Sequence, residues 1–215
     1  MKHVSSVVAC VCSLAFATAP AWAQDSARID QGGAGNQAVI EQIASGGNNQ
    51  ASVHQGEGWY GSSGNSAQLM QHAVDNARID VMQSGFNNQY SVFQHDGSNL
   101  QASINVNSGM YGQTGGDGNQ VTIHQAGWGA WANVEQGGSY FSRAEIVQHG
   151  ADGQNIADIR QSGSTNDALV YQHTGGNQAS VQQMGNNLSA SIMQQSNGYG
   201  YGYGAGNNAT IRQGY

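Results

Sequence analysis

Beyond residue 23 the sequence contains no cysteine and no proline. The two cysteines, Cys10 and Cys12, and the single proline, Pro20, all precede that point. Without a thiol, the rest of the chain cannot be a disulfide-stabilised scaffold, a cysteine-ligated metal protein or a thiol enzyme. Without proline, every backbone N–H in that part of the chain is available to the hydrogen-bond ladder of a β-sheet.

Residues 1–23 have the layout of a secretory signal. Lys2 precedes an apolar run, and the small-residue pattern of a cleavage site, A-W-A, occupies positions 21–23. The apolar run is too short to span a bilayer. We therefore expect residues 1–23 to be a signal peptide, residues 24–215 to form a single repeat domain, and the protein to be secreted.

Charged residues are scarce as well, at 9% of the sequence. After residue 23, five arginines stand against 13 acidic residues, which gives a net charge of −8. Nucleic-acid binding depends on clustered cations that displace counterions, so this balance argues against a nucleic-acid partner. The acidic residues are scattered, and nothing in their spacing pairs them for acid–base chemistry. We expect no enzyme, no cofactor and no metal centre.

What the sequence does contain is glycine, asparagine, glutamine and serine, a composition typical of disordered low-complexity chains. Its apolar residues are nevertheless periodic. The pattern Asn-x-Ala-x-Ile/Val-x-Gln recurs throughout the chain after residue 23, for example at 36–42, 155–161 and 177–183. Together with looser copies, and a degenerate one at 100–106 that lacks both amides, we count fifteen.

Within each copy the recurring residues are two apart, which is the period of a β-strand with one buried face. Asn, Ala, Ile/Val and Gln then point into a core, and the residues between them point outward. The closing glutamines most often lie 11 residues apart, as from Gln161 to Gln172, which leaves a short Gly-rich turn after a seven-residue strand. Because such a strand cannot bury its face alone, the copies have to stack on one another.

The turns indicate how they stack. Segments of the form Gln-x-Gly-x-x-Asn join an odd-numbered strand to the next even-numbered one, as at 31–36, 83–88 and 161–166, and even-to-odd junctions look different. One turn of the structure is therefore two strands. We predict an all-β fold, a two-sheet parallel β-solenoid of about fifteen strands, in which odd strands stack on odd strands and even on even.

In such a stack, equivalent inward amides lie over one another, so each can donate to the amide above and accept from the amide below. A buried amide left unpaired would cost roughly 1 to 3 kcal/mol. The predicted structural amide ladder consists of Gln31, Asn36, Gln42, Asn49, Gln55, Asn65, Gln71, Gln83, Asn88, Gln94, Asn119, Gln125, Gln136, Gln148, Asn155, Gln161, Asn166, Gln172, Asn177, Gln183, Gln194, Asn207 and Gln213.

At these residues the chain resembles the curlins, the subunits of bacterial curli amyloid fibres, whose repeat reads Ser-x5-Gln-x-Gly-x-x-Asn-x-Ala-x-x-x-Gln. Residues 31–42 and 161–172 match its second part, 83–94 departs only by Tyr90, and 207–215 is similar to the end of the major type of subunit. The resemblance implies a subunit that crosses the outer membrane unfolded through a secretion pore. Outside the cell it would polymerise with itself and with another curli subunit into fibres for adhesion and biofilm matrix.

Four histidines directly follow closing glutamines. His72, His95, His149 and His173 come after strands four, six, ten and twelve, so each adjacent pair should lie about one strand spacing apart on the same edge. Two functional roles are open for these histidines. Their imidazoles could become protonated in acid and loosen assembly by repulsion, or they could bind a transition metal. The alternative is repeat drift in a solvated turn.

A different class of function is a monomeric secreted β-solenoid that binds ice or carbohydrate. Such a module would need a regular outward array, for example Thr-x-Thr on every turn. The outward positions of this sequence are mixed, which favours the fibre subunit.

Overall fold

The computed structural model describes residues 25–43, 47–56, 63–106, 117–150, 154–195 and 207–214. The expected signal peptide, residues 1–23, lies outside these ranges. Within them the chain forms fifteen strands and no helix, and accordingly none that could cross a membrane. The strands are β1 (Ser26–Gln31), β2 (Gln37–Ile43), β3 (Gln50–Gln55), β4 (Ser66–Asp75), β5 (Arg78–Gln83), β6 (Gln89–Ser98), β7 (Gln101–Val106), β8 (Gln120–Trp128), β9 (Trp131–Gln136), β10 (Arg143–Gly150), β11 (Ile156–Ser162), β12 (Asp167–His173), β13 (Gln178–Met184), β14 (Ser189–Gln195) and β15 (Asn208–Gln213).

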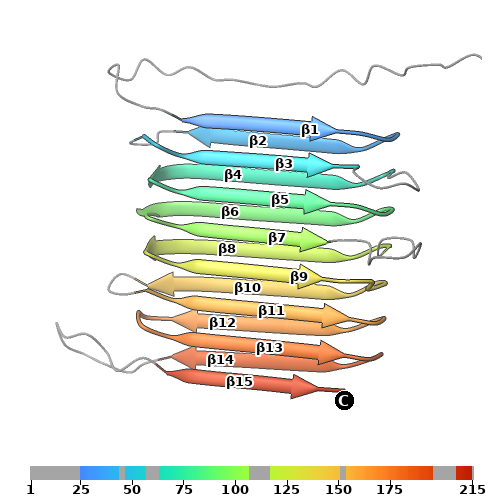
Figure 1. The fold of residues 1–215 in the computed structure, drawn as a ribbon. Coiled ribbons are helices and arrows are strands. Elements are labelled where there is room, and N and C mark those ends of the chain that lie inside the picture. Colours follow the sequence, from blue (N-terminus) through green and yellow to red (C-terminus); the bar gives the residue numbers. More distant parts are fainter. Residues whose placement is uncertain are drawn as a thin grey trace, which may run out of the picture.

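The strands form two sheets. Odd-numbered strands make one eight-stranded sheet, from β1 to β15 in sequence order, and even-numbered strands make one seven-stranded sheet, from β2 to β14. Neighbours in both sheets are parallel. The chain alternates between the sheets from one end of the stack to the other (Figure 1). The predicted two-sheet parallel β-solenoid, with two strands per turn, is confirmed.

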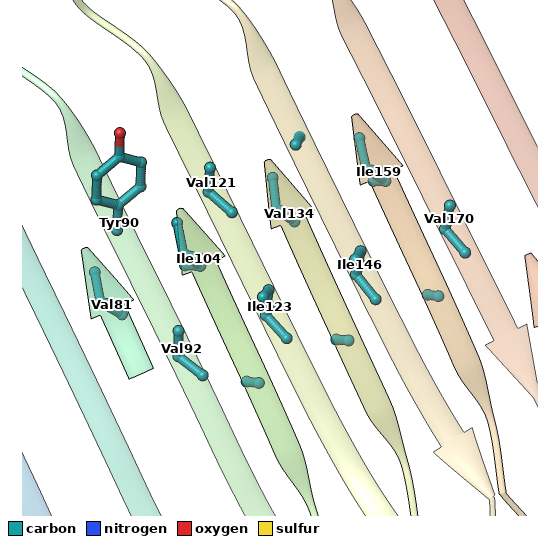
Figure 2. Close-up of a cluster of buried hydrophobic side chains, with 14 of the residues drawn as sticks. Val81, Tyr90, Val92, Ile104, Val121, Ile123, Val134, Ile146, Ile159 and Val170 are labelled. Atoms are coloured by element: carbon teal, nitrogen blue, oxygen red, sulfur yellow. The ribbon is translucent and has the colours of Figure 1, made fainter. Parts of the chain in front are cut away.

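The register places each copy of the repeat over the next one in its sheet. Between β10 and β12, for example, Ile146 lies beside Val170 and Gln148 beside Gln172. The inward residues of both sheets meet in one thin apolar core (Figure 2). Burying a valine or isoleucine side chain contributes about 1.5 to 3 kcal/mol, so the inward rows of Ile/Val, with alanine beside them, stabilise the stack at every turn.

Tyr90 stands where the repeat usually has alanine. It lies in register between Ala67 and Val121, and its side chain is buried among aliphatic residues (Figure 2). Its hydroxyl finds no hydrogen-bond partner in the described part of the chain. Burial raises the pKa of Tyr90 well above its usual value.

Four even strands are longer than the seven residues predicted. β4 and β6 each span ten residues, β8 spans nine and β10 spans eight, because they continue past their closing glutamines into the turns. The register between β6 and β8 shifts between His95 and Gly97 at this point. A Cβ on Gly127, whose φ is +109°, would lie 1.7 Å from the carbonyl oxygen of Gly150. Glycine is required there because the backbones of adjacent turns approach so closely.

Candidate functional site: the amide ladders and the sheet edges

The closing glutamines of the even sheet form one uninterrupted column of side-chain hydrogen bonds. The Nε2 of each glutamine donates to the Oε1 of the next at 2.8 to 3.0 Å. Every bond runs in the same direction, from the N-terminal strand toward the C-terminal one. The column is therefore polar, and it consists of Gln42, Gln71, Gln94, Gln125, Gln148, Gln172 and Gln194.

The same glutamines also tie one sheet to the other. Nε2 of Gln125 in β8 donates to the carbonyl of Gln101, the first residue of β7, at 2.9 Å. Gln148 donates in the same way to Trp131 at 3.1 Å. This bond to the preceding strand recurs at Gln42, Gln55, Gln71, Gln83, Gln94, Gln161, Gln172, Gln183, Gln194 and Gln213. Sequence reasoning missed these bonds, because period-two spacing describes a single sheet.

The equivalent column of the odd sheet is interrupted in its middle. Side-chain bonds link Gln31, Gln55 and Gln83 on one side of the gap and Gln136, Gln161, Gln183 and Gln213 on the other. In the gap, β7 places Val106 in register with Gln83, and valine has no group that donates or accepts. As a result, the buried Oε1 of Gln136 receives no hydrogen bond from the described residues.

The asparagines differ from the expected amide-to-amide pattern. The Oδ1 of Asn65 accepts the main-chain N–H of Asn88 at 2.9 Å, and that of Asn88 accepts the N–H of Asn119 at 3.0 Å. The same bond to the next strand is made by Asn36, Asn49, Asn119, Asn155, Asn166 and Asn177. Asn207 is bonded to Asn177 by both its N–H and its Nδ2. Asparagine is one methylene shorter than glutamine, so its oxygen reaches the backbone of the next strand.

The Nδ2 groups of the asparagines hold the turns in place. Asn65 donates to the carbonyl of Gly85 at 2.9 Å, and Asn119 donates to that of Ser139 at 2.8 Å. Each of these buried asparagines thus satisfies both ends of its amide and fixes where the neighbouring turn lies. This follows the general rule that buried polar groups are paired.

Where the odd sheet lacks asparagine, an apolar cluster takes its place. Ala77, Leu100 and Ala130 hold the asparagine positions of three successive odd strands and pack with Val74 in a second, smaller core. The middle of the odd sheet is therefore the part of the structure in which both amide columns are interrupted, the asparagine column here and the glutamine column at Val106.

The stack is incomplete at its two ends. Ile29 and Ile40 at one end, and Ala209 and Ile211 at the other, are only partly buried although they face the core. In the described part of the chain, β1 pairs only with β3 and β15 only with β13. Among the described residues nothing pairs with the outer edges of β1 and β15, and neither strand carries a proline or charged inward residue that would discourage pairing.

The direction of the open hydrogen bonds follows from the interior strands. In each odd strand up to β13, the N–H of the first residue donates toward the next odd strand, as Gln178 does to the carbonyl of Asn207 at 2.7 Å. Asn208 holds the equivalent position in β15. Its N–H, and that of Thr210 two residues on, therefore face the open edge.

The four histidines that follow closing glutamines, here called the edge histidines, lie where the sequence spacing predicts them: His72, His95, His149 and His173. His72 is in register with His95, and His149 with His173, on the outer side of the even sheet, so the predicted pairing is confirmed. The spacing did not identify His124, which lies on β8 between the two pairs. No group of three or more His, Cys, Asp or Glu side chains within the described ranges is arranged to hold a metal ion.

The comparison with known families gives one match. Residues 154–183, which run from just before β11 to near the end of β13, match the model of the curlin associated repeat. This match supports the resemblance noted in the sequence. No curated protein and no solved structure matches the chain significantly.

Proposed function

We propose that this chain, whose residues 154–183 match the curlin associated repeat, is a structural subunit of extracellular curli-type amyloid fibres. The observation that carries the proposal is the polar, unbroken glutamine column of the even sheet. Because every rung donates in the same direction, the column continues only where the N-terminal end of one copy meets the C-terminal end of another. The inward amides would serve as the structural ladder of the fibre.

The open edges support the same proposal. The N–H groups at the outer edge of β15 face outward, and the inward apolar residues of the terminal strands remain partly exposed. A second copy stacked in register would pair those backbone groups and bury those side chains at the same time. Exposed parallel edges of this kind are templates for strand addition.

The biological setting comes from the resemblance to curlins. We infer that the fibre forms on the bacterial surface and mediates cell adhesion and biofilm matrix formation. We also infer that the subunit reaches that surface through an outer-membrane secretion pore and meets another curli subunit there. The chain would carry no catalytic activity in this role.

The test is assembly of the purified chain, with and without preformed fibres as seeds. We expect dye-binding fibres and a lag phase that seeds abolish. Thr210→Pro removes an N–H from the open edge of β15 without removing a bond to β13, so it should block growth at that end. Thr210→Ala keeps the N–H and should elongate normally. A chain that stays monomeric at high concentration would contradict the proposal and favour the monomeric binding module.

A further inference from the structure

Three imidazole rings gather on the outer face of the even sheet. The ring centroids of His95 in β6 and His124 in β8 are 4.9 Å apart, and those of His124 and His149 in β10 are 5.2 Å apart. The distance from His95 to His149 is 6.4 Å. We call these residues the three-histidine cluster.

The three rings converge because a small residue, Ala126, lies between His95 and His149. Ala126 of β8 is in register with His95 on one side and with His149 on the other. Its small side chain leaves space over the sheet, and the imidazole of His124, two residues earlier on the same face, contacts both neighbours. The cluster therefore bridges three adjacent strands.

Aromatic rings flank the cluster. Phe93 lies 4.9 Å from His95 and 5.1 Å from His124, and Tyr171 lies 6.5 Å from His149. The Nε2 of His124 is buried and has no hydrogen-bond partner among the described residues. If His124 were protonated, that nitrogen would carry an N–H without an acceptor, which is costly in a buried position.

Little negative charge faces the cluster. On β6, Asp96 contacts Nδ1 of His95 at 3.0 Å. On β10, Glu145 is paired with Arg143 at 2.7 Å, and on β12, Asp167 lies at the far end of the strand from His173. The other titratable groups nearby are the imidazoles of His72 on β4 and His173 on β12 and the Tyr171 phenol. Protonated rings would therefore face mainly one another.

Burial lowers the pKa of His124 below its ordinary value, and repulsion from His95 and His149 lowers it further. The pKa of His149 is lowered by burial and by its neighbours His95 and His173. A histidine whose pKa is lower in the folded state binds more protons when unfolded, so folding stability rises with pH. This contribution is complete above about pH 6.5, the ordinary histidine value, and is lost as the pH falls below it.

We propose that the three-histidine cluster is a pH-sensitive lock that holds β6, β8 and β10 together when its rings are neutral and loosens the solenoid when they become charged. The lock requires only the folded solenoid, so it is tested on unassembled protein and does not depend on the proposed fibre function. Each unit by which one histidine pKa is lowered raises the unfolding equilibrium constant about tenfold in acid.

The experiment compares two triple variants with the same change in composition. One is His95→Gln/His124→Gln/His149→Gln, which removes the cluster. The matched control is His54→Gln/His72→Gln/His173→Gln, which removes three histidines outside it. The unfolding midpoint in urea is measured for each variant and for the unchanged chain at about pH 7.5 and about pH 5, on either side of the histidine pKa.

We expect the midpoint of the unchanged chain and of the control to fall on acidification, and most of that fall to disappear in the cluster variant. An equal fall in the cluster variant, or loss of the fall in the control, would overturn the proposal. A second measurement, on the unchanged chain, tests the proposal even if a variant fails to fold. Ring NMR titration of the unchanged chain should show pKa values of His124 and His149 below the ordinary histidine value, and ordinary values for these two residues would also overturn the proposal.

Discussion

Gln83 on β5 and Gln136 on β9 belong to the same glutamine column of the odd sheet, and β7, which lies between them, has no glutamine at the corresponding position. Gln83 donates to the carbonyl of Ser66 at 3.3 Å, and its register partner on β7 is Val106. Gln136 donates onward to Gln161 at 2.8 Å, while its own buried Oε1 receives no bond from the described residues. The gap makes the energy of one rung accessible to measurement.

Val106→Gln should restore the rung. The new amide would accept from Gln83 and donate to the buried Oε1 of Gln136, which none of the described residues bonds. We expect the free energy of unfolding to rise by about 1 kcal/mol, measured by urea denaturation.

The control is a double-mutant cycle with Gln136→Ala. In that background the oxygen that the new amide would satisfy is gone, so Val106→Gln should stabilise the protein by less. Equal stabilisation in both backgrounds would show that the gain does not come from the ladder.

Gln125→Ala should destabilise the fold through the ladder. It removes the donor to the Oε1 of Gln148 and to the carbonyl of Gln101, and it removes one of the two acceptors of Gln94, which keeps its bond to the carbonyl of Arg78. The buried Oε1 of Gln148 loses its donor and two other groups lose one hydrogen bond each, which predicts a loss of roughly 2 to 4 kcal/mol. Gln120→Ala, at an exposed position of the same strand, should change stability by less than about 0.5 kcal/mol. Similar losses for both variants in chemical denaturation would refute the role of the column.

Tyr90→Phe should leave the protein as stable or more stable, by up to about 1 kcal/mol, because the hydroxyl that it removes is buried and has no hydrogen-bond partner in the described ranges. The raised pKa of Tyr90 adds a pH dependence. Above about pH 10 the unfolded chain loses the phenolic proton first, so stability falls with rising pH. Melting temperatures at alkaline pH should fall less for the phenylalanine variant. A large destabilisation at neutral pH would show that the hydroxyl has a partner.

Gly163→Ala tests the turn of a repeat that matches the family model. The φ of Gly163 is +103°, and an added Cβ would lie 1.9 Å from the carbonyl oxygen of Gly185. We expect a loss of at least about 2 kcal/mol from strain and displacement of the next turn. Gly137 has nothing within 4 Å of an added Cβ, so Gly137→Ala should be nearly neutral. Thermal melts of both variants decide whether close stacking of the turns is required.

The sequence predicts most of the fold because its period-two pattern and its alternating turns are each repeated many times. The spacing from Asn36 to Gln42 assigns inward faces, and the recurring Gln-x-Gly turns assign each strand to its sheet. Every later strand receives the correct odd or even number only if the degenerate copy at 100–106 is counted as a strand. The structure places β7 there.

What the sequence does not predict depends on side-chain reach in three dimensions. Asn65 bonds to a backbone N–H because its side chain is short, and Gln125 reaches Gln101 in the other sheet because the two sheets are close. His124 joins the edge histidines because Ala126 leaves space above the sheet. None of these contacts appears in residue spacing along one strand.

In the proposed fibre, one copy of the solenoid extends the stack of another along a shared axis. Fibre diffraction from aligned, assembled protein measures this most directly. We expect a meridional reflection at about 4.8 Å, the spacing between hydrogen-bonded strands, because the strands lie across the fibre axis. A pattern in which that reflection lies on the equator, or is absent from well-ordered fibres, would contradict it.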